Sequence, residues 1–247
     1  MNIFALHRSG LLPSSDRKQG RHSGFSLIEM LVVVAIIGIL AGILLSALSQ
    51  VKQHVKIKLA KVDMANLLAA ISQYEATYER PPLSKGAFAS ATPGCPDFTF
   101  GTVRSDGTLT AAPAVLSTGN NGYNSDNSEL VRILLDIDEG SNQNHALNPR
   151  RFRFLEAKLA GDNRSPGVGP DGVFRDPWGQ PYIVTIDLNE DGVCQDGFYH
   201  PLTSGPNPWL IRKPAIAWSF GPDAKADPNR ATGPKGGANH DNILSWE

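Results

Sequence analysis

The hydrophobic pattern divides the chain into a polar beginning, an unbroken apolar run and a long mixed remainder. Residues 1–23 are polar and basic, whereas residues 30–45 contain no polar side chain. The apolar run continues to Leu48 and is interrupted only by Ser46. A helix rises ~1.5 Å per residue and needs roughly 20 residues to cross a ~30 Å hydrocarbon layer. The stretch from Phe25 to Leu48 is therefore predicted to be a transmembrane helix.

Two ordinary explanations of this segment compete at first. A secretory signal peptide has an apolar core of ~7–15 residues followed by a small-residue cleavage site, and neither feature fits here. A plain single-pass anchor fits the pattern and stays open. The basic residues ahead of the run predict that the N-terminus is cytoplasmic and that the rest of the chain lies outside.

The helix is predicted to continue beyond the membrane until Pro81 and Pro82 end it. Apolar residues recur at spacings of three to five, as on one face of an amphipathic helix. A helix from Phe25 to Glu79 would be ~80 Å long, too long for a compact domain of this size, so its first half is expected to extend from the domain. The residues of the predicted apolar face are Val55, Leu59, Val62, Leu67, Ile71, Tyr74 and Tyr78.

The remainder predicts an α+β fold, with the long helix packed on a small antiparallel sheet with irregular loops. Residues 83–124 are rich in Gly, Ser, Thr and Pro, which indicates an irregular segment. Two short helices are expected, one capped by Ser125 or Asp126 and one running from Asn148 to Leu159. Three strands are expected: Tyr182–Asp187, its partner Gly197–Tyr199, and Ala215–Phe220.

Composition and charge narrow the class of protein. With 41% hydrophobic and 19% charged residues the chain is predicted to fold. The formal net charge of -1, without a basic block after the first residues, argues against nucleic acid as a partner. The histidines pair with no plausible nucleophile in spacing, and no phosphate-binding glycine loop is found, so we expect no enzyme.

Glu29 is the unusual residue of the apolar segment. A carboxylate at the centre of a membrane helix costs roughly 2.5 kcal/mol or more, and such groups usually have a partner. Glu29 is either an ordinary boundary residue or a partner for a positive group from another subunit. The free amine of a chain cut just before Phe25 is the natural candidate for that group.

The string GFSLIEMLVVVAIIGILAG, Gly24 to Gly42, resembles the N-terminal signature of type IV prepilins and type II secretion pseudopilins. The resemblance implies that a prepilin peptidase cuts after Gly24 and N-methylates Phe25, and that Glu29 neutralises the amine of a neighbouring subunit. It implies a leader at 1–24, a transmembrane and filament-core helix at 25–48, an amphipathic continuation at 49–80 and an extracytoplasmic pilin-like domain at 81–247.

The same resemblance implies a place and partners for the protein. The chain is expected in the inner membrane with its C-terminal domain in the periplasm, and then in a periplasmic or extracellular filament. Its partners would be other pilin or pseudopilin subunits, the prepilin peptidase and an inner-membrane assembly platform. The alternatives are a membrane-anchored binding module or enzyme outside any filament, and a single-pass protein never cut at Gly24.

Small residues lie at every fourth position of the apolar run, at Gly38, Gly42 and Ser46. This spacing places them on one helical face, where they allow close approach of another helix in lipid. Glycine is also simply frequent in membrane helices, so both interpretations stay open.

Two later segments resemble the major pseudopilin of type II secretion. The first is DPWGQPYIV, Asp176 to Val184, and the second is the ending from Ser219 to Trp246, which contains SFGPD, GG and DNILSW. The chain is longer than that family's usual member in two places, after Pro82 and between Asp223 and Gly236.

Calcium is the candidate structural ion, and no cofactor is required by the sequence. The string from Asp187 to Asp196 offers oxygen ligands around Gly192, as in the first half of a calcium loop. The twelfth position is Phe198 instead of glutamate, so the loop is no EF-hand, and a metal-free hairpin turn is the alternative. The candidate ligands are Asp187, Asn189, Asp191 and Asp196.

The resemblance to the major pseudopilin implies a second calcium site in the closing loop. Asp223 and Asp241 would be its side-chain ligands, together with backbone carbonyls near Phe220. Solvated loop carboxylates are the alternative. The two cysteines, Cys95 and Cys194, would form one disulfide in an oxidising compartment or stay as two thiols.

Overall fold

A computed structural model describes residues 24–89, 97–101, 126–199, 210–227, 229 and 231–247. The chain forms two units, residues 1–48 and 49–247. The helix α1, Leu27–Tyr78, supplies residues to both units, and each unit is considered by itself.

The start of α1 is fixed by a reciprocal capping box. The Ser26 hydroxyl oxygen accepts from the Ile28 N–H at 3.3 Å, and the Glu29 carboxylate accepts from the Ser26 N–H at 2.8 Å. This arrangement satisfies two of the N–H groups that a helix start leaves without partners. The helix ends at Tyr78, ahead of Glu79 with its left-handed φ of 54° and of the Pro81–Pro82 pair, so the predicted long helix is confirmed.

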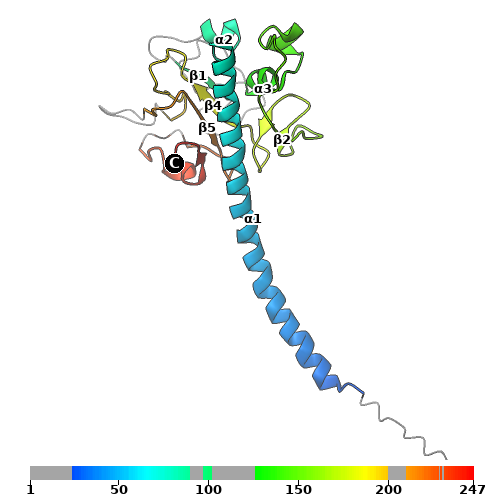
Figure 1. Ribbon diagram of the computed structural model, residues 1–247. Coiled ribbons are helices and arrows are strands. Elements are labelled where there is room, and N and C mark those ends of the chain that lie inside the picture. Colours follow the sequence, from blue (N-terminus) through cyan, green and yellow to red (C-terminus); the bar gives the residue numbers. More distant parts are fainter. Residues whose placement is uncertain (1–23, 90–96, 102–125, 200–209, 228, 230) are drawn as a thin grey trace, which may run out of the picture. The chain divides into compact units, whose positions relative to one another are not determined.

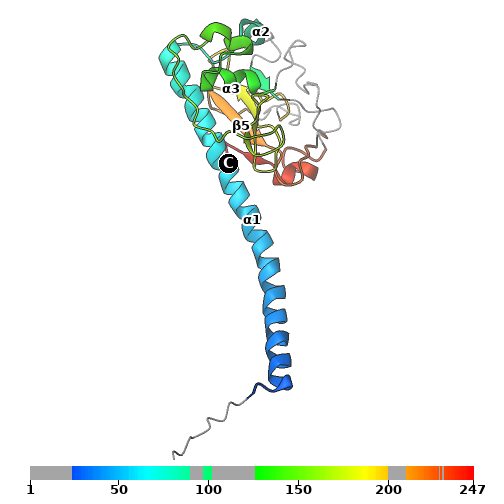
Figure 2. The same cartoon turned by 90° about the vertical axis from the view of Figure 1, so that its right-hand side faces the viewer.

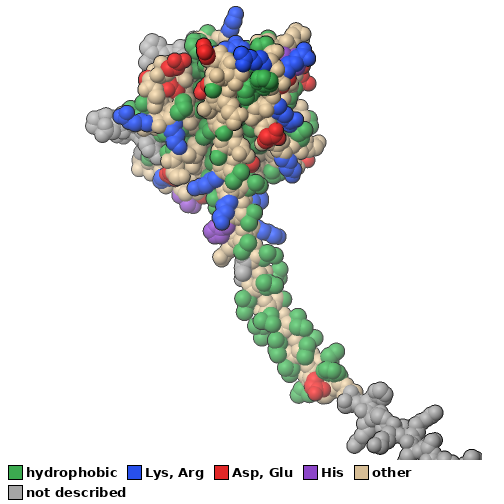
Figure 3. All heavy atoms as spheres, in the orientation of Figure 1, with side chains coloured by type: hydrophobic (Ala, Val, Ile, Leu, Met, Phe, Trp, Pro, Cys, Tyr) green, Lys and Arg blue, Asp and Glu red, His purple; other side chains and the backbone are tan. Residues whose placement is uncertain are grey.

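In the first unit the apolar side chains of α1 are exposed (Figure 3). Their exposed fractions range from 44% for Val33 to 84% for Leu27. By length and composition α1 is able to cross a membrane. A helix that is hydrophobic all round is stable only when something other than water surrounds it.

In the second unit a four-stranded antiparallel sheet has the order β1-β4-β5-β6 (Figure 1). Two of these strands, β4 and β5, were predicted and are confirmed. The bounds are Phe98–Phe100 for β1, Ile183–Ile186 for β4, Ala215–Ser219 for β5 and Ile243–Leu244 for β6.

The core lies between the second half of α1 and one face of this sheet; Figures 1 and 2 both show β5 alongside that part of the helix. Side chains such as Val184 and Ala217 face α1, whereas Ile183 and Trp218 face the loops on the other side. This alternation is the period of two that a pleated strand imposes. The buried residues of α1 are Ala60, Met64, Leu67, Ala70, Ile71 and Tyr74.

The predicted apolar face of α1 is right in its second part and wrong in its first. Val55, Leu59 and Val62 are 58%, 47% and 54% exposed. The five-residue step from Val62 to Leu67 turns the helix by about 140°, because each residue advances about 100°. The first three residues therefore lie on a different face from the residues that enter the core.

The short helix expected after Asp126 is confirmed as α3, Ser128–Leu135 (Figure 2). Its apolar side chains pack into the same core. Before it, Asn127 bonds the backbone of Phe174 and Tyr182 and ties α3 to the hairpin that precedes β4. That hairpin pairs β2, Gly167–Val168, with β3, Phe174–Arg175.

Two predicted elements are wrong. Asn148 starts no helix, because its amide donates to the Ile133 and Phe152 carbonyls and accepts from the Phe152 N–H. Gly197–Tyr199 forms a turn instead of a strand, because the Asp196 carboxylate accepts both the Phe198 and Tyr199 N–H groups. Local side-chain bonds of this kind compete with regular secondary structure.

The segment expected to be irregular contains two short elements, α2 at Lys85–Ala89 and the edge strand β1. Residues 90–96 and 102–124 of this segment lie outside the described part of the chain. Two 3₁₀ turns complete the described elements: η1, Gly140–His145, follows α3, and η3, Gly237–Asp241, precedes β6.

Candidate processing and assembly site

The junction between Gly24 and Phe25 lies just ahead of the capped start of α1. Both residues are exposed, Phe25 to 77%, and neither belongs to a helix or strand. A Cβ atom added at Gly24 would meet nothing within 4 Å. Packing within the described part of the chain therefore does not require glycine at this position.

Glu29 is one turn into the helix and is already bound within its own chain. Its carboxylate accepts from the Ser26 N–H, and it lies where the positive end of the helix dipole favours a negative charge. The sequence reasoning missed this bond, although the S-x-x-E spacing of Ser26 and Glu29 is the signal of a capping box. The carboxylate is therefore held near the residue that would become the new N-terminus.

The predicted stripe of small residues leaves open space on α1. A Cβ atom at Gly38 or Gly42 would meet nothing within 4 Å. The Ser46 side chain lies outside what the structure describes. Nothing in the described part of this unit covers the two glycines, so the stripe stays a prediction about contacts with another helix.

The loop after β4 does not bring together the four expected calcium ligands. Asn189 and Asp191 bond each other at 2.9 Å, and the Asp187 carboxylate accepts from the Gly192 N–H at 2.8 Å. Asp196 is buried, and its carboxylate accepts from Thr185 and the Trp218 indole. Within the described residues no group of three His, Cys, Asp or Glu side chains is placed to hold a metal.

The closing loop does bring Asp223 and Asp241 together. The Asp223 N–H donates to the Asp241 carboxylate at 3.2 Å, and the other Asp241 oxygen has no hydrogen-bond partner among the described residues. Burial first, and then the neighbouring Asp223, raises the pKa of Asp241. The Asn242 amide, turned so that its NH2 group faces the carbonyls, donates to the Phe220 oxygen at 3.0 Å.

The two segments that resemble the major pseudopilin are bonded to each other. Asp176 of DPWG is buried and accepts from the N–H groups of Trp178 and Gln180 and from the Ser219 hydroxyl. The Trp178 indole donates to Gln53 of α1 at 3.1 Å. These bonds join α1, the turn before β4 and the end of β5, which explains why a buried aspartate stands in this turn.

Cys194 is a free, buried thiol, and Cys95 lies outside the described residues. Burial, reinforced by the nearby carboxylates of Asp97 and Asp187, raises the pKa of the Cys194 thiol. A thiol of this kind is unreactive, because the thiolate is the nucleophile.

Comparison with known proteins adds one decisive finding. Residues 20–45 match the model of the prokaryotic N-terminal methylation motif. This match supports the pilin family. It spans the junction, Glu29 and most of the apolar run, and it indicates a substrate of prepilin peptidase and a structural subunit. Together with α1, it fits a single-pass, membrane-anchored protein. No curated protein and no solved structure matches the chain.

For a pilin-type protein the observed geometry has a clear meaning. The junction residues are exposed, and the pilin-type motif implies processing by prepilin peptidase and assembly with other pilin subunits.

Proposed function

We propose that this protein is a structural subunit of a type II secretion or type IV pilus-like filament, cut after Gly24 and N-methylated at Phe25. The observation that carries the proposal is the placement of an exposed cleavage junction one turn before Glu29, at the start of a helix with exposed apolar side chains. No catalytic step is assigned to the chain.

Cleavage changes the electrostatics at this end of the helix. Before the cut, the nitrogen of Phe25 is a neutral amide, and Glu29 has the Ser26 N–H as a hydrogen-bond donor but forms no ion pair within the described residues. After the cut, the same nitrogen is a protonated amine, and methylation keeps its positive charge. An ion pair gains strength in apolar surroundings, so Glu29 favours a neighbouring subunit that presents this amine.

The apolar side chains of the first unit need a cover at every stage. Lipid covers them in the membrane, and the helices of neighbouring subunits cover them in a filament. Close packing between such helices depends on small residues, which Gly38 and Gly42 provide. The proposal puts the N-terminus in the cytoplasm and the second unit in the periplasm, and the basic residues before the run support this orientation.

Within the pilin family, one contact supports the type II secretion branch. It joins the two segments of this chain that resemble the major pseudopilin. Asp176 of DPWG binds Ser219 of the closing segment, so both form one structural feature next to the sheet. We propose a relationship to the major pseudopilin on this basis, and an inner-membrane assembly platform as a further partner.

Calcium in the closing loop is part of this proposal. Asp223 and Asp241 are adjacent, and carboxylate oxygens suit a hard cation. The Asp241 oxygen that accepts no hydrogen bond lies 3.9 Å from the His240 Nδ1 atom, so a calcium ion would compete with His240 for it. The Asn242 amide uses the Phe220 carbonyl, so other ligands would complete the shell. A rise in melting temperature at millimolar calcium is expected, and its loss in D223N.

The test of the proposed function separates processing from assembly. The chain is expressed with a prepilin peptidase and an assembly platform, and the variants Glu29→Val and Glu29→Gln are compared with the parent. We expect both variants to be cut normally and to yield at least tenfold fewer filaments. Normal filament yield from Glu29→Val would rule out the pairing of Glu29 with the amine.

A further inference from the structure

Lysines gather in a short stretch of α1 that follows the apolar run. They are the first charged residues after Glu29, and no acidic residue stands between Glu29 and Asp63. All of them belong to the second unit. We call this set the lysine collar, and its members are Lys52, Lys56, Lys58 and Lys61. Lys56 is half-buried, and the other three side chains are exposed.

The described part of the chain does not neutralise the charge of the lysine collar. None of its members forms an ion pair with a described residue. Asp63, the next charged residue along α1, accepts from the Tyr182 hydroxyl at 3.1 Å. Glu247 lines a groove with Lys61 but pairs with Lys235 at 2.6 Å. The ammonium groups of the collar are therefore able to attract an anionic partner.

The lysines are spread around the helix instead of lying on one face. Each residue advances about 100° around an α-helix, so Lys52 and Lys56 lie about 40° apart. By the same rule Lys58 and Lys61 lie about 60° apart, on the side opposite the first pair. Figure 3 shows Lys and Arg side chains on both sides of α1 at the edge of the second unit. A partner that binds the whole collar must therefore surround the helix.

Side chains of two further kinds accompany the lysines. Val51 and Val55 are 56% and 58% exposed, so apolar surface continues among the charges. The half-buried Trp178 donates its indole N–H to Gln53 at 3.1 Å. The Lys56 ammonium lies 5.7 Å from the centre of the same ring. Tryptophan, lysine and exposed apolar residues together are typical of a segment at the boundary between lipid and water.

The covalent chain keeps the collar near the end of the predicted transmembrane stretch. Lys52 follows Leu48 so closely in the sequence that their backbones lie within about 14 Å of each other. From Lys52 to Lys61 the helix rises by about 14 Å. A headgroup layer of about 5–7 Å flanks the hydrocarbon on each side, and long lysine side chains extend toward it. Lys52 and Lys56 are thus the members nearest to the headgroups.

We propose that the lysine collar binds the headgroups of anionic phospholipids, such as phosphatidylglycerol, in the membrane surface next to Leu48. A layer of headgroups surrounds a helix on every side, as the arrangement of the lysines requires. The attraction of a lysine to an anionic surface falls off within a Debye length of about 8 Å. Lys52 and Lys56 therefore contribute most and Lys61 contributes least. The inference rests on the membrane anchoring of the chain and not on the proposed filament.

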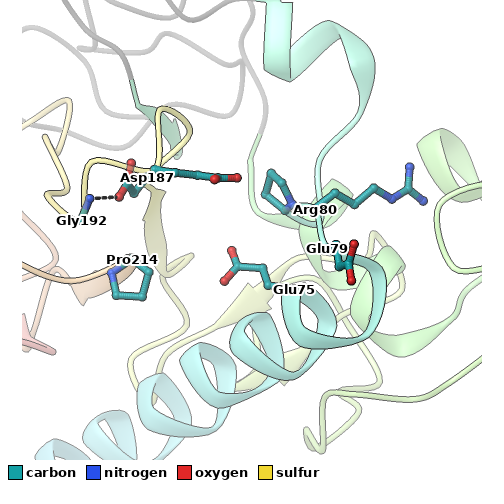
Figure 4. Close-up of a pocket in the computed structure, with 8 residues that line it drawn as sticks. Glu75, Glu79, Arg80, Asp187, Gly192 and Pro214 are labelled. Carbon is teal, nitrogen blue, oxygen red and sulfur yellow. Dashed lines mark hydrogen bonds between the residues drawn. The ribbon is translucent and has the colours of Figure 1, made fainter.

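A second copy of the chain is the other partner of suitable charge. Glu75, Glu79 and Asp187 line a cleft of about 420 Å³ farther along α1 (Figure 4). These carboxylates occupy one side of the copy that carries them, so they are able to face only one pair of lysines in the collar. A lipid surface accounts for both pairs, and it also accounts for Trp178 and the exposed valines beside them.

The test measures which lipids the chain selects. The full chain is reconstituted in phosphatidylcholine vesicles with a trace of spin-labelled phosphatidylglycerol or spin-labelled phosphatidylcholine. Electron spin resonance then gives the ratio of the two association constants at the protein surface. We expect phosphatidylglycerol to be preferred about threefold at low salt, and less at high salt, because ions screen the attraction.

Two variants remove or keep the charge of the collar. Replacing its four lysines by glutamine should reduce the preference for phosphatidylglycerol by about half or more. The basic residues before the apolar run are the same in every variant, so a difference between variants comes from the collar. Replacing the same four lysines by arginine should leave the preference unchanged. Among single variants, Lys52→Gln should lose more of the preference than Lys61→Gln.

The matched control for Lys52→Gln is Lys85→Gln. Lys85 is an exposed lysine of α2, which lies near the C-terminal end of α1 (Figure 1). Its loss removes the same charge outside the collar, and we expect an unchanged preference for phosphatidylglycerol. Equal losses in Lys85→Gln and Lys52→Gln would overturn the assignment in favour of the net charge of the chain.

Two further outcomes would overturn the proposal. The first is an unchanged preference in the chain with four glutamines; fewer filaments from that chain would then assign the lysines to contacts with a second copy. The second is a preference abolished by inorganic phosphate but not by sodium chloride of equal ionic strength, which would indicate a site for free phosphate. Circular dichroism checks the folding of each variant. If the chain with four glutamines does not fold, Lys52→Gln/Lys58→Gln takes its place under the same criteria.

Discussion

The two halves of α1 share one backbone but have opposite surfaces. In the first half, Leu27 to Leu48, large apolar side chains are exposed on the helix. In the second half, one face enters the core, and Tyr74 donates to the Leu147 carbonyl from the same face. The comparison shows that hydrophobic side chains alone do not reveal whether a helix packs on its own chain, on lipid or on another subunit. The second half is stabilised by its own chain, whereas the first half requires lipid or other subunits.

The largest expected effect contrasts two leucines of the same helix. Leu67 is fully buried, whereas Leu40 is 60% exposed. Leu67→Ala should lower the free energy of unfolding by about 2–5 kcal/mol, because it leaves a cavity in the core. Leu40→Ala should change it by less than ~0.5 kcal/mol. Chemical denaturation in detergent micelles measures both, and equal losses would contradict the division of α1.

The next largest effect on stability concerns a hydrogen bond between α1 and Tyr182, the residue just before β4. The Tyr182 hydroxyl donates to the Asp63 carboxylate at 3.1 Å, and burial raises the pKa of Asp63 while this bond lowers it. Tyr182→Phe should cost about 1.5 kcal/mol at pH 7, because a partly buried carboxylate loses its donor. The same denaturation assay checks this value. An unchanged midpoint would show that the bond contributes nothing to the second unit.

The titration of Glu75, near the end of α1, predicts that the stability of the second unit depends on pH. The pKa of Glu75 is raised from 4.5 to about 7, so folding favours the protonated form. The associated stability is fully present below pH 4.5 and is lost as the pH rises through 7. Glu75→Gln should flatten this decline in calcium-free buffer.

The size of this effect is modest because solvent reaches Glu75. At pH 8 the Glu75→Gln chain should melt roughly 2–4 °C above the parent, equivalent to about 1 kcal/mol after allowance for screening. Melting curves from pH 4 to 8 with a chelator measure the difference. A parent chain with the same pH profile as Glu75→Gln would contradict the raised pKa.

The smallest effect on folding concerns the misassigned part of α1. Leu59 is 47% exposed, so Leu59→Ala should change the free energy of unfolding by less than ~0.5 kcal/mol. A loss as large as that of Leu67→Ala would mean that the second unit buries both faces of α1. Parallel filament assays would show whether Leu59 acts between subunits instead.

Elements with a strong local pattern were predictable from the sequence. The apolar run, the proline pair after α1 and the apolar spacing of α3 each act over a few neighbouring residues. The strand β1 was missed because it has only three residues and pairs with β4, far away in the sequence. The helix expected at Asn148 failed for a related reason, since the Asn148 amide bonds the distant Ile133 carbonyl.

The candidate sites also differ in whether their residues are close together in the sequence. The junction, Phe25 and Glu29 are adjacent in sequence, and a short motif suffices to find them. Glu75 and Asp187 come from distant elements and line one cleft, and no local spacing signals that they share it. Asp196 has the right spacing for the loop site, but Thr185 and Trp218 bind its carboxylate in the core. Sequence spacing cannot show which side a carboxylate faces when distant strands decide it.

The central claim is that Gly24–Phe25 is a processing junction, and the most direct test determines the N-terminus of the mature chain. The protein is expressed with a prepilin peptidase, purified from membranes and examined by intact-mass and N-terminal peptide analysis. The account predicts a mature chain that begins with N-methylated Phe25, and slower cleavage of Gly24→Ala. A chain that stays uncut, or that begins at any residue other than Phe25, would contradict it.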